Sequence, residues 1–130
     1  MSVYSDVLNS VIELMEETKP YARIVVGSNV PANGICVLPT PATSRTFLDK
    51  NTDMEWIIAL NGKNADQLTV FEALSKIHTS LTRRKDYPSD TNYQIYDIST
   101  VAGPRLIGRQ ENDQWIYGSS LRIRFYMRGE

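Results

Sequence analysis

The sequence contains very few of the side chains on which metal and thiol chemistry depends. Its 130 residues include one cysteine, Cys36, and one histidine, His78. A single cysteine excludes an internal disulfide framework and any metal site built from several thiolates. A single histidine excludes sites that need two imidazole ligands. Most classes of zinc enzyme are therefore excluded, and we expect neither a metal site nor a cofactor.

The sequence also lacks a strong charge of one sign and a long apolar run. Its 14 lysines and arginines against 15 acidic residues give a formal net charge of -1, which is no signature of sequence-specific nucleic-acid binding. Apolar stretches such as Ile24–Val26 are far shorter than the roughly 20 residues of a membrane span. The first residues have no basic lead, so we expect no signal peptide and folding in a reducing cytoplasm.

Length and composition together predict one globular domain over residues 1–130. This length is close to the commonest size for a single hydrophobic core. Hydrophobic residues make up 42% and charged residues 22%, both near the average for soluble globular proteins.

Two segments show the periodicity of amphipathic helices. The first is predicted from Val3 to Thr18, with Ser2 or Ser5 as N-cap and Pro20 just beyond its end. The second is predicted from Ala65 to Arg84. Asn64 or Asp66 is its candidate N-cap, and its apolar arc contains Val70, Phe71, Leu74, Ile77, His78 and Leu81.

Short β-branched segments in the first half predict strands. Residues 23–26 and 35–38 are separated by the turn-forming stretch SNVPANG, which predicts a hairpin. A third strand is predicted at Met54–Leu60. The segment Pro39–Asp53 has no clear periodicity and is predicted as a long loop, a type that is often functional.

The last third of the sequence is predicted to be β. Tyr93–Ser99 is one strand, and Leu106–Ile107 is expected to pair with Trp115–Ile116 across a polar turn. The final strand has the clearest alternation in the chain. Leu121, Ile123, Phe125 and Met127 point to one side, and Arg122, Arg124, Tyr126 and Arg128 point to the other.

These elements predict an α+β fold, because the helices interrupt the strands instead of alternating with each of them. We expect an antiparallel or mixed sheet of about four to six strands with two helices packed on one face. Leu74, Ile77 and Leu81 should pack against the apolar side of the last strand.

No arrangement of residues predicts catalysis. His78 lies on the apolar arc of the second helix, which favours a partly buried structural histidine over an acid–base catalyst. Cys36 lies within a strand and is expected to be a small buried apolar residue. Asp49, Asp53 and Glu55 are close enough in sequence to hold a cation, but their spacing is not that of a calcium loop.

The arginines of the last strand are the strongest candidates for an interaction surface. A polar face of this kind on an antiparallel strand is commonly only the side of the sheet that faces solvent. Arginine is nevertheless enriched over lysine where planar or bidentate contacts form between proteins. We therefore assign a candidate interface to Arg122, Arg124, Arg128, Arg45 and Asp49.

The order of segments resembles the small tail terminator proteins of long-tailed bacteriophages, in the branch described as minor capsid proteins. The resemblance spans nearly the whole chain. Its most telling part is the final third, where a Gly-Pro-x-hydrophobic-hydrophobic-Gly stretch leads through a polar turn to an aromatic residue and a long alternating strand. The segments that carry it are YARIVVG, ICVLP, WIIAL, LTVFEALSKIHTSL, GPRLIG, WIY and LRIRF.

The resemblance implies a structural protein of the virion, made in the host cytoplasm and placed at the head–tail junction. Tail terminators form a ring, usually hexameric, that caps the finished tail tube, stops its polymerisation and offers a surface to the head. The implied partners are further copies of the chain, the major tail tube protein and a head-completion or connector protein. No catalytic residues are implied, and we expect the ring contacts at the sheet edges and the arginine-lined face.

Two other functions remain open from the sequence. A head–tail connector, such as a head-closure or neck protein, would also be an α+β ring subunit. A small cytosolic enzyme or binding domain would instead have a concave pocket with convergent polar groups and a titratable residue of shifted pKa.

Overall fold

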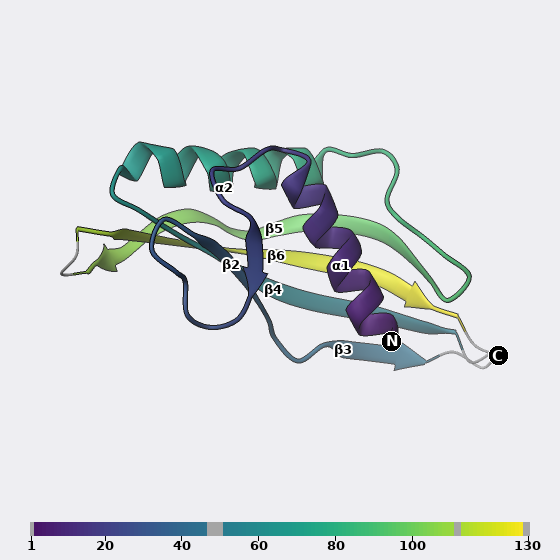
Figure 1. Ribbon diagram of the computed structural model, residues 1–130. Helices are drawn as coiled ribbons and strands as arrows, with labels where there is room; N and C mark the ends of the chain where they lie inside the picture. Colours follow the sequence, from purple (N-terminus) through teal and green to yellow (C-terminus); the bar gives the residue numbers. More distant parts are fainter. Residues whose placement is uncertain (1, 47–50, 111–112, 129–130) are drawn as a thin grey trace.

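Both helices of the described chain lie on one face of a six-stranded sheet (Figure 1). The structure is a computed structural model that describes residues 2–46, 51–110 and 113–128. It confirms the predicted α+β fold with two helices and a mixed sheet. In chain order the elements are α1 (Val3–Glu16), β1 (Ile24–Val26), β2 (Ile35–Pro39), β3 (Thr43–Thr46), β4 (Thr52–Asn64), α2 (Gln67–Thr82), β5 (Tyr93–Arg109) and β6 (Trp115–Met127).

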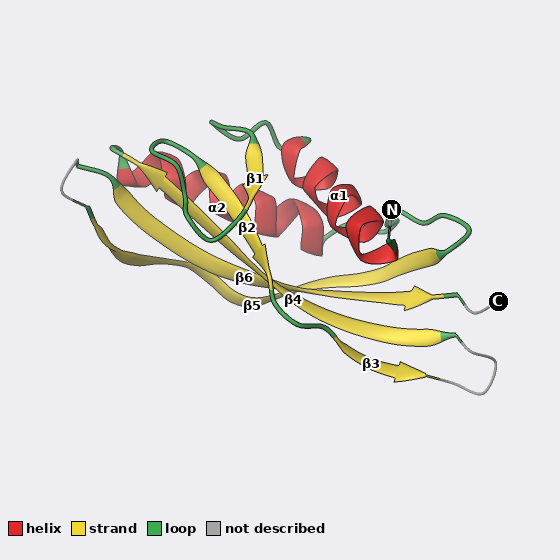
Figure 2. Cartoon of the chain, turned by 60° about the horizontal axis from the view of Figure 1, so that its bottom comes forward, coloured by secondary structure: helices red, strands yellow, loops and turns green. Residues whose placement is uncertain are grey.

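The sheet is built around the two long central strands. β4 and β6 pair antiparallel along their full lengths, from Thr52 opposite Met127 to Asn64 opposite Trp115. The strand order is β1-β2-β4-β6-β5, and β3 pairs with β4 beyond the end of β2. The short strand β1 and the long strand β5 therefore lie at opposite edges of the sheet (Figure 2).

The predicted hairpin between the first two strands is wrong, although both strands form where they were expected. β1 and β2 run parallel, with Ile24 beside Ile35. β1 is three residues long, which corresponds to only about 10 Å. The connection 27–34 can return over that length, since about eight extended residues span up to ~26 Å.

The segment Pro39–Asp53 was predicted as a loop, but its described residues contain strands, while residues 47–50 lie outside the described residues. It contains β3 and the first residues of β4, which pair antiparallel with Thr43 opposite Glu55 and Thr46 opposite Thr52. Both strands are polar here, so no apolar alternation marks them in the sequence. The β-branched threonines favour the extended backbone.

β5 is one strand, whereas the sequence predicted two separate pieces. Its register against β6 shifts at several points between Ile95 and Gly108. Such bulges break the two-residue alternation that identifies a strand in a sequence. The predicted pairing at the end of the hairpin is confirmed with a small shift, because Leu106 lies opposite Tyr117 and Gly108 opposite Ile116.

The helices begin at polar caps, as predicted, and are slightly shorter than expected. The Oγ atom of Ser2 accepts a hydrogen bond from the backbone N–H of Ser5 at 3.2 Å, at the start of α1. Oδ1 of Asp66 accepts one from the backbone N–H of Leu68 at 3.3 Å, at the start of α2. A side-chain acceptor satisfies one of the backbone donors that a helix leaves unpaired at its first turn.

The core lies between the helices and the inner face of the sheet. The predicted contact set is confirmed, since its six residues are fully buried in one cluster: Leu74, Ile77, Leu81, Leu121, Ile123 and Phe125. Aromatic side chains hold α1 against the sheet. The ring of Tyr4 packs edge-on against Trp56, with 5.6 Å between the ring centres. Burial on this inner face leaves the opposite, outer face available for other contacts.

Candidate interaction surface

The outer face of the sheet, turned away from the helices, carries two of the predicted interface arginines. The alternation along β6 is confirmed, because Leu121, Ile123 and Phe125 are fully buried on the inner side. Arg122 and Arg124 lie between them in the strand and are partly exposed. Successive side chains of a strand point to opposite faces, so both arginines belong to the outer face.

Acidic side chains from the neighbouring strands surround these arginines. Glu55 on β4 lies opposite Arg124, and Asp97 on β5 lies opposite Arg124 on its other side. The Nε atom of Arg122 is 2.7 Å from Oε1 of Glu55. Both partners are partly exposed, so this ion pair stabilises the fold by at most about 1 kcal/mol. The outer face is therefore a surface of mixed charge and not a basic stripe.

Two tyrosines extend this polar network along the same face. The hydroxyl of Tyr96 donates a hydrogen bond to Oδ1 of Asp53 at 2.6 Å. The ring of Tyr96 stacks on Tyr126 with 5.0 Å between the ring centres. Burial, followed by the hydrogen bond to Asp53, raises the pKa of Tyr96 above its ordinary value. Tyr96 therefore stays protonated at neutral pH and acts as a donor.

A hollow of about 300 Å³ opens between these groups on the outer face. It lies at the lower end of the volumes typical of small-molecule sites, which are mostly apolar. Its polar lining suits a charged or hydrogen-bonding side chain of another protein. The residues that line it are Thr43, Asp53, Met54, Glu55, Tyr96 and Arg124.

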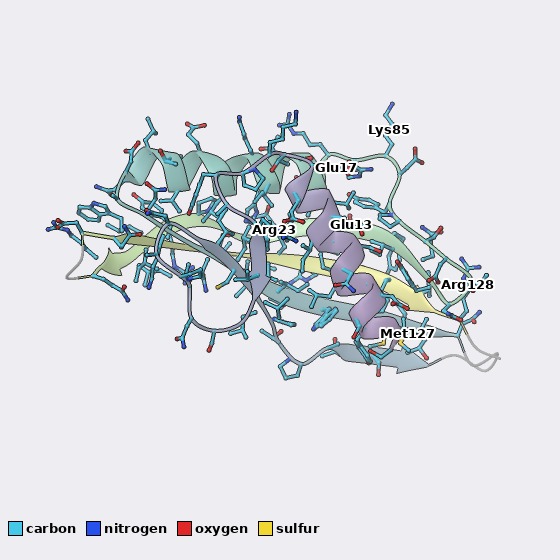
Figure 3. The ribbon with its side chains drawn as sticks, viewed as in Figure 1. Glu13, Glu17, Arg23, Lys85, Met127 and Arg128 are labelled. Atoms are coloured by element: carbon cyan, nitrogen blue, oxygen red, sulfur yellow. The ribbon has the colours of Figure 1, made fainter. Side chains whose placement is uncertain are left out.

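The other predicted interface residues are dispersed. Arg45 lies in β3 at the register position opposite Asp53, beside the outer-face network. Arg128 follows the end of β6, where its exposed side chain points away from the sheet (Figure 3) and its backbone N–H donates to the carbonyl of Asn92 at 2.9 Å. Asp49 lies outside the described residues. The structure thus brings Arg122 and Arg124 together on the outer face, and the strand register places residue Arg45 opposite Asp53.

The acids and tyrosines of this network were not predicted as interface residues. Asp53 and Glu55 were considered only as cation ligands, although they alternate with the buried Met54 and Trp56 and so must share the outer face. That alternation was a usable signal. The sequence around Tyr96 gave no such signal, because this residue lies at a register shift of β5.

His78 and Cys36 are buried, as predicted. The Nδ1 atom of His78 lies 2.8 Å from Oγ1 of Thr100, and the side chain is buried between α2 and the sheet. Burial lowers the pKa of His78 and raises the pKa of the Cys36 thiol. Both groups are therefore neutral and enclosed at neutral pH, which is not the setting of a reactive site.

The described part of the chain offers no cluster of three or more histidine, cysteine, aspartate or glutamate side chains that could hold a metal ion. Asp53 and Glu55, the closest approach to such a cluster in the sequence, are bound to Tyr96 and Arg122 instead. Neither described helix is long and apolar enough to cross a membrane.

Comparison with known proteins identifies the fold. No family model and no curated protein sequence matches the chain. Its structure is similar to a chain in a solved structure described as the virion of a native gene transfer agent (GTA) particle. The similarity covers 97% of this chain and 99% of that chain, with a TM-score of 0.60 and 11% sequence identity. The two chains therefore share a fold over their whole lengths.

Proposed function

We propose that the chain is a structural virion protein and, within that class, a tail terminator. It forms a ring that caps the finished tail tube, stops its polymerisation and provides the surface that joins the head. The observation that carries this proposal is the similarity in fold to a chain of the gene transfer agent virion, which extends over 97% of this chain and 99% of that one. The sequence resemblance to tail terminators supports the same class of function.

The sequence predicted ring contacts at the arginine-lined face, but its arginines already lie beside carboxylates of their own chain. We therefore propose the outer face as the surface that the ring offers to other virion components. Its charges come in pairs, with Arg122 beside Glu55 and Arg124 between Glu55 and Asp97. A mixed pattern of this kind selects a partner by complementarity more than it raises affinity, because a mismatched charge is costly. The tail tube protein and the head-completion protein are the proposed partners.

Ring closure requires that each subunit offer two different surfaces to its neighbours. The sheet has two unlike edges, the short parallel strand β1 and the long strand β5. A net charge of -1 allows copies to pack without strong mutual repulsion. We propose a ring of six, either in solution or assembled on the tube.

The decisive experiment adds the purified chain to polymerising tail tube protein from the same virus. Electron microscopy should show tubes with a ring at one end and no further elongation. Virions made without the chain should carry tails of uncontrolled length. Tails of normal length that fail to join heads would instead assign the chain to the head-closure or neck connector.

A single substitution tests the part played by the outer face. Arg124→Gln should leave the circular dichroism spectrum and the ring unchanged and weaken tube or head binding by at least about tenfold, the effect of one lost interfacial charge pair. Lys85→Gln makes the same change of charge at an exposed position beyond the end of α2 (Figure 3) and should bind normally. Equal binding by both variants would remove the outer face from the proposal.

A further inference from the structure

We propose that copies of this chain contact one another head to tail, through the β5 arm of one copy and the α1–β1 edge of the next. The β5 arm consists of residues 101–109 of β5 and residues 115–117 of β6. The α1–β1 edge consists of residues 13–17 at the end of α1 and residues 24–26 of β1. This inference rests on the proposed function and identifies its subunit interface.

The β5 arm exposes apolar side chains on both of its faces. Leu106 and Ile107 are 49% and 55% exposed, and Val101 is 44% exposed. Leu106 lies opposite Tyr117, whereas the side chain of Ile107 lies against the adjacent Gly118. Adjacent residues of β6 face opposite sides of the sheet, so neither face of the arm is fully covered. The hairpin of β5 and β6 extends past the first turn of α2 (Figure 1). Exposed apolar side chains grouped in this way mark a contact surface more often than single ones do.

The α1–β1 edge has the same property at the opposite side of the sheet. Val25 and Val26 are 44% and 56% exposed, again on opposite faces of one strand. The end of α1 is tied to this strand, because Oε2 of Glu16 accepts a hydrogen bond from the backbone N–H of Ile24 at 3.3 Å. The strand order places β1 and β5 at the two edges, so the two apolar surfaces face away from each other and cannot meet within one copy.

The charges around the two surfaces are complementary. The β5 arm carries the exposed Arg105 and Arg109; Arg109 lies over the ring of Trp115 at 5.3 Å and pairs with Asp113. The α1–β1 edge exposes Glu13 and Glu17, which lie one helical turn apart on α1 (Figure 3). Asp113 offsets the charge of Arg109 within the same copy, so the positive charge that the β5 arm offers to Glu13 and Glu17 of the next copy comes mainly from Arg105.

Cations are also present at the α1–β1 edge, but carboxylates outnumber them. Glu13, Glu16 and Glu17 stand against Lys19 and Arg23 over this stretch. A second copy is therefore the occupant that fits each surface best. The second copy offers apolar side chains and charges of opposite sign to each surface.

The β5 arm is poorly suited to extending the sheet of a neighbour through its backbone. Its pairing with β6 shifts register on both sides of Gly103 and Pro104. Bulges and proline on an edge strand prevent the regular ladder that edge-to-edge aggregation needs. Contact through side chains is thus favoured over open-ended sheet growth. Because the two surfaces differ, the contact is heterologous and closes into a ring when the rotation between copies allows it.

Charge reversal with rescue tests this interface on the full chain. One variant carries Arg105→Glu with Arg109→Glu, a second carries Glu13→Arg with Glu17→Arg, and a third combines all four changes. Sedimentation velocity should show that the wild type associates. The association constant of each double variant should be at least about tenfold lower. The fourfold variant, and an equal mixture of the two double variants, should regain it, since opposite charges face each other again.

A matched control and a second kind of variant distinguish a lost interface from a lost fold. Arg83→Glu with Lys85→Glu lowers the net charge by the same amount as Arg105→Glu with Arg109→Glu, but outside both surfaces, and should associate like the wild type. Leu106→Ser and Val26→Ser should each weaken association without altering the circular dichroism spectrum. Association that survives all of these changes, or equal loss in the control, would overturn the interface.

A wild-type chain that stays monomeric at about 1 mM, where even contacts of ~4 kcal/mol are populated, and that also forms no ring on tail tubes would overturn the interface as well. None of the outcomes with the variants contradicts the proposed function, because that function is measured separately by tube capping. Normal rings that fail to cap tubes would conversely leave the interface intact and contradict the tail terminator.

Discussion

Arg122 on β6 and Glu55 on β4 form an ion pair across the outer face of the sheet, with 2.7 Å between Nε and Oε1. An arginine that the sequence marks as an interface cation is thus already compensated within its own chain. A partner of this face must match alternating charges, which favours specificity over strong general attraction.

The strength of this ion pair can be measured with a double-mutant cycle on Glu55→Gln and Arg122→Gln. Urea unfolding should give a coupling free energy of about 0.2–1 kcal/mol, because both side chains are partly exposed and screened by water. The pair Glu55→Gln and Lys85→Gln serves as a control and should show additivity. A coupling above about 2 kcal/mol would indicate that the pair is far more enclosed than in the structure.

The hydrogen bond between Tyr96 and Asp53 should contribute measurably to stability. Tyr96→Phe keeps the ring stacked on Tyr126 and removes only the donor to Asp53, so we expect a loss of about 0.5–1.5 kcal/mol in the free energy of unfolding. Tyr126→Phe is the matched control, because it keeps the same stack and leaves that hydrogen bond in place. Equal losses in the two variants would argue against the 2.6 Å hydrogen bond.

The helix–sheet core should be sensitive to Leu74, which is fully buried. Leu74→Ala should lower the free energy of unfolding by about 2–5 kcal/mol through lost burial and a residual cavity. Leu68 on the same helix is 62% exposed, and Leu68→Ala should change stability by less than about 0.5 kcal/mol. Urea melts of both variants check this contrast, and a loss below about 1 kcal/mol at Leu74 would contradict the packing.

The parts of the fold that follow from local periodicity could be predicted from the sequence. The helical wheels placed Leu74 and Leu81 on the buried arc, and the alternation of the last strand separated Phe125 from Arg124 correctly. One face of each element is apolar and the other polar, so burial and sequence pattern agree. The same wheel also placed Phe71 on the apolar arc, yet this residue is 40% exposed, and its ring contacts Tyr117 of β6.

What could not be predicted depends on pairing between distant segments. Nothing local indicates that β1 runs parallel to β2, since that direction is set by the path of the connection 27–34. The acids that surround Arg122 and Arg124 come from β4 and β5, so the mixed charge of the outer face emerges only from the register of three strands. Bulges in β5 likewise hide the position of Tyr96 from any two-residue pattern.

His78 should make stability depend on pH in a range where no other side-chain type normally titrates. It is the single histidine of the chain, it is buried, and its Nε2 atom has no hydrogen-bond partner among the described residues. Burial lowers its pKa below the ordinary value of 6.5, so the unfolded chain takes up a proton more readily than the folded chain.

The free energy of unfolding should therefore be at its full value above pH 6.5 and should fall as the pH drops toward the folded pKa of His78. Urea melts between about pH 7.5 and pH 5 isolate this effect, because the ordinary pKa values of carboxylates lie near 4. His78→Gln should remove the slope over that range while leaving the proposed tube capping intact, since the side chain is buried away from the outer face. A slope that persists in His78→Gln would assign the pH dependence to another group, and a folded variant that no longer caps tubes would contradict a purely structural role for His78.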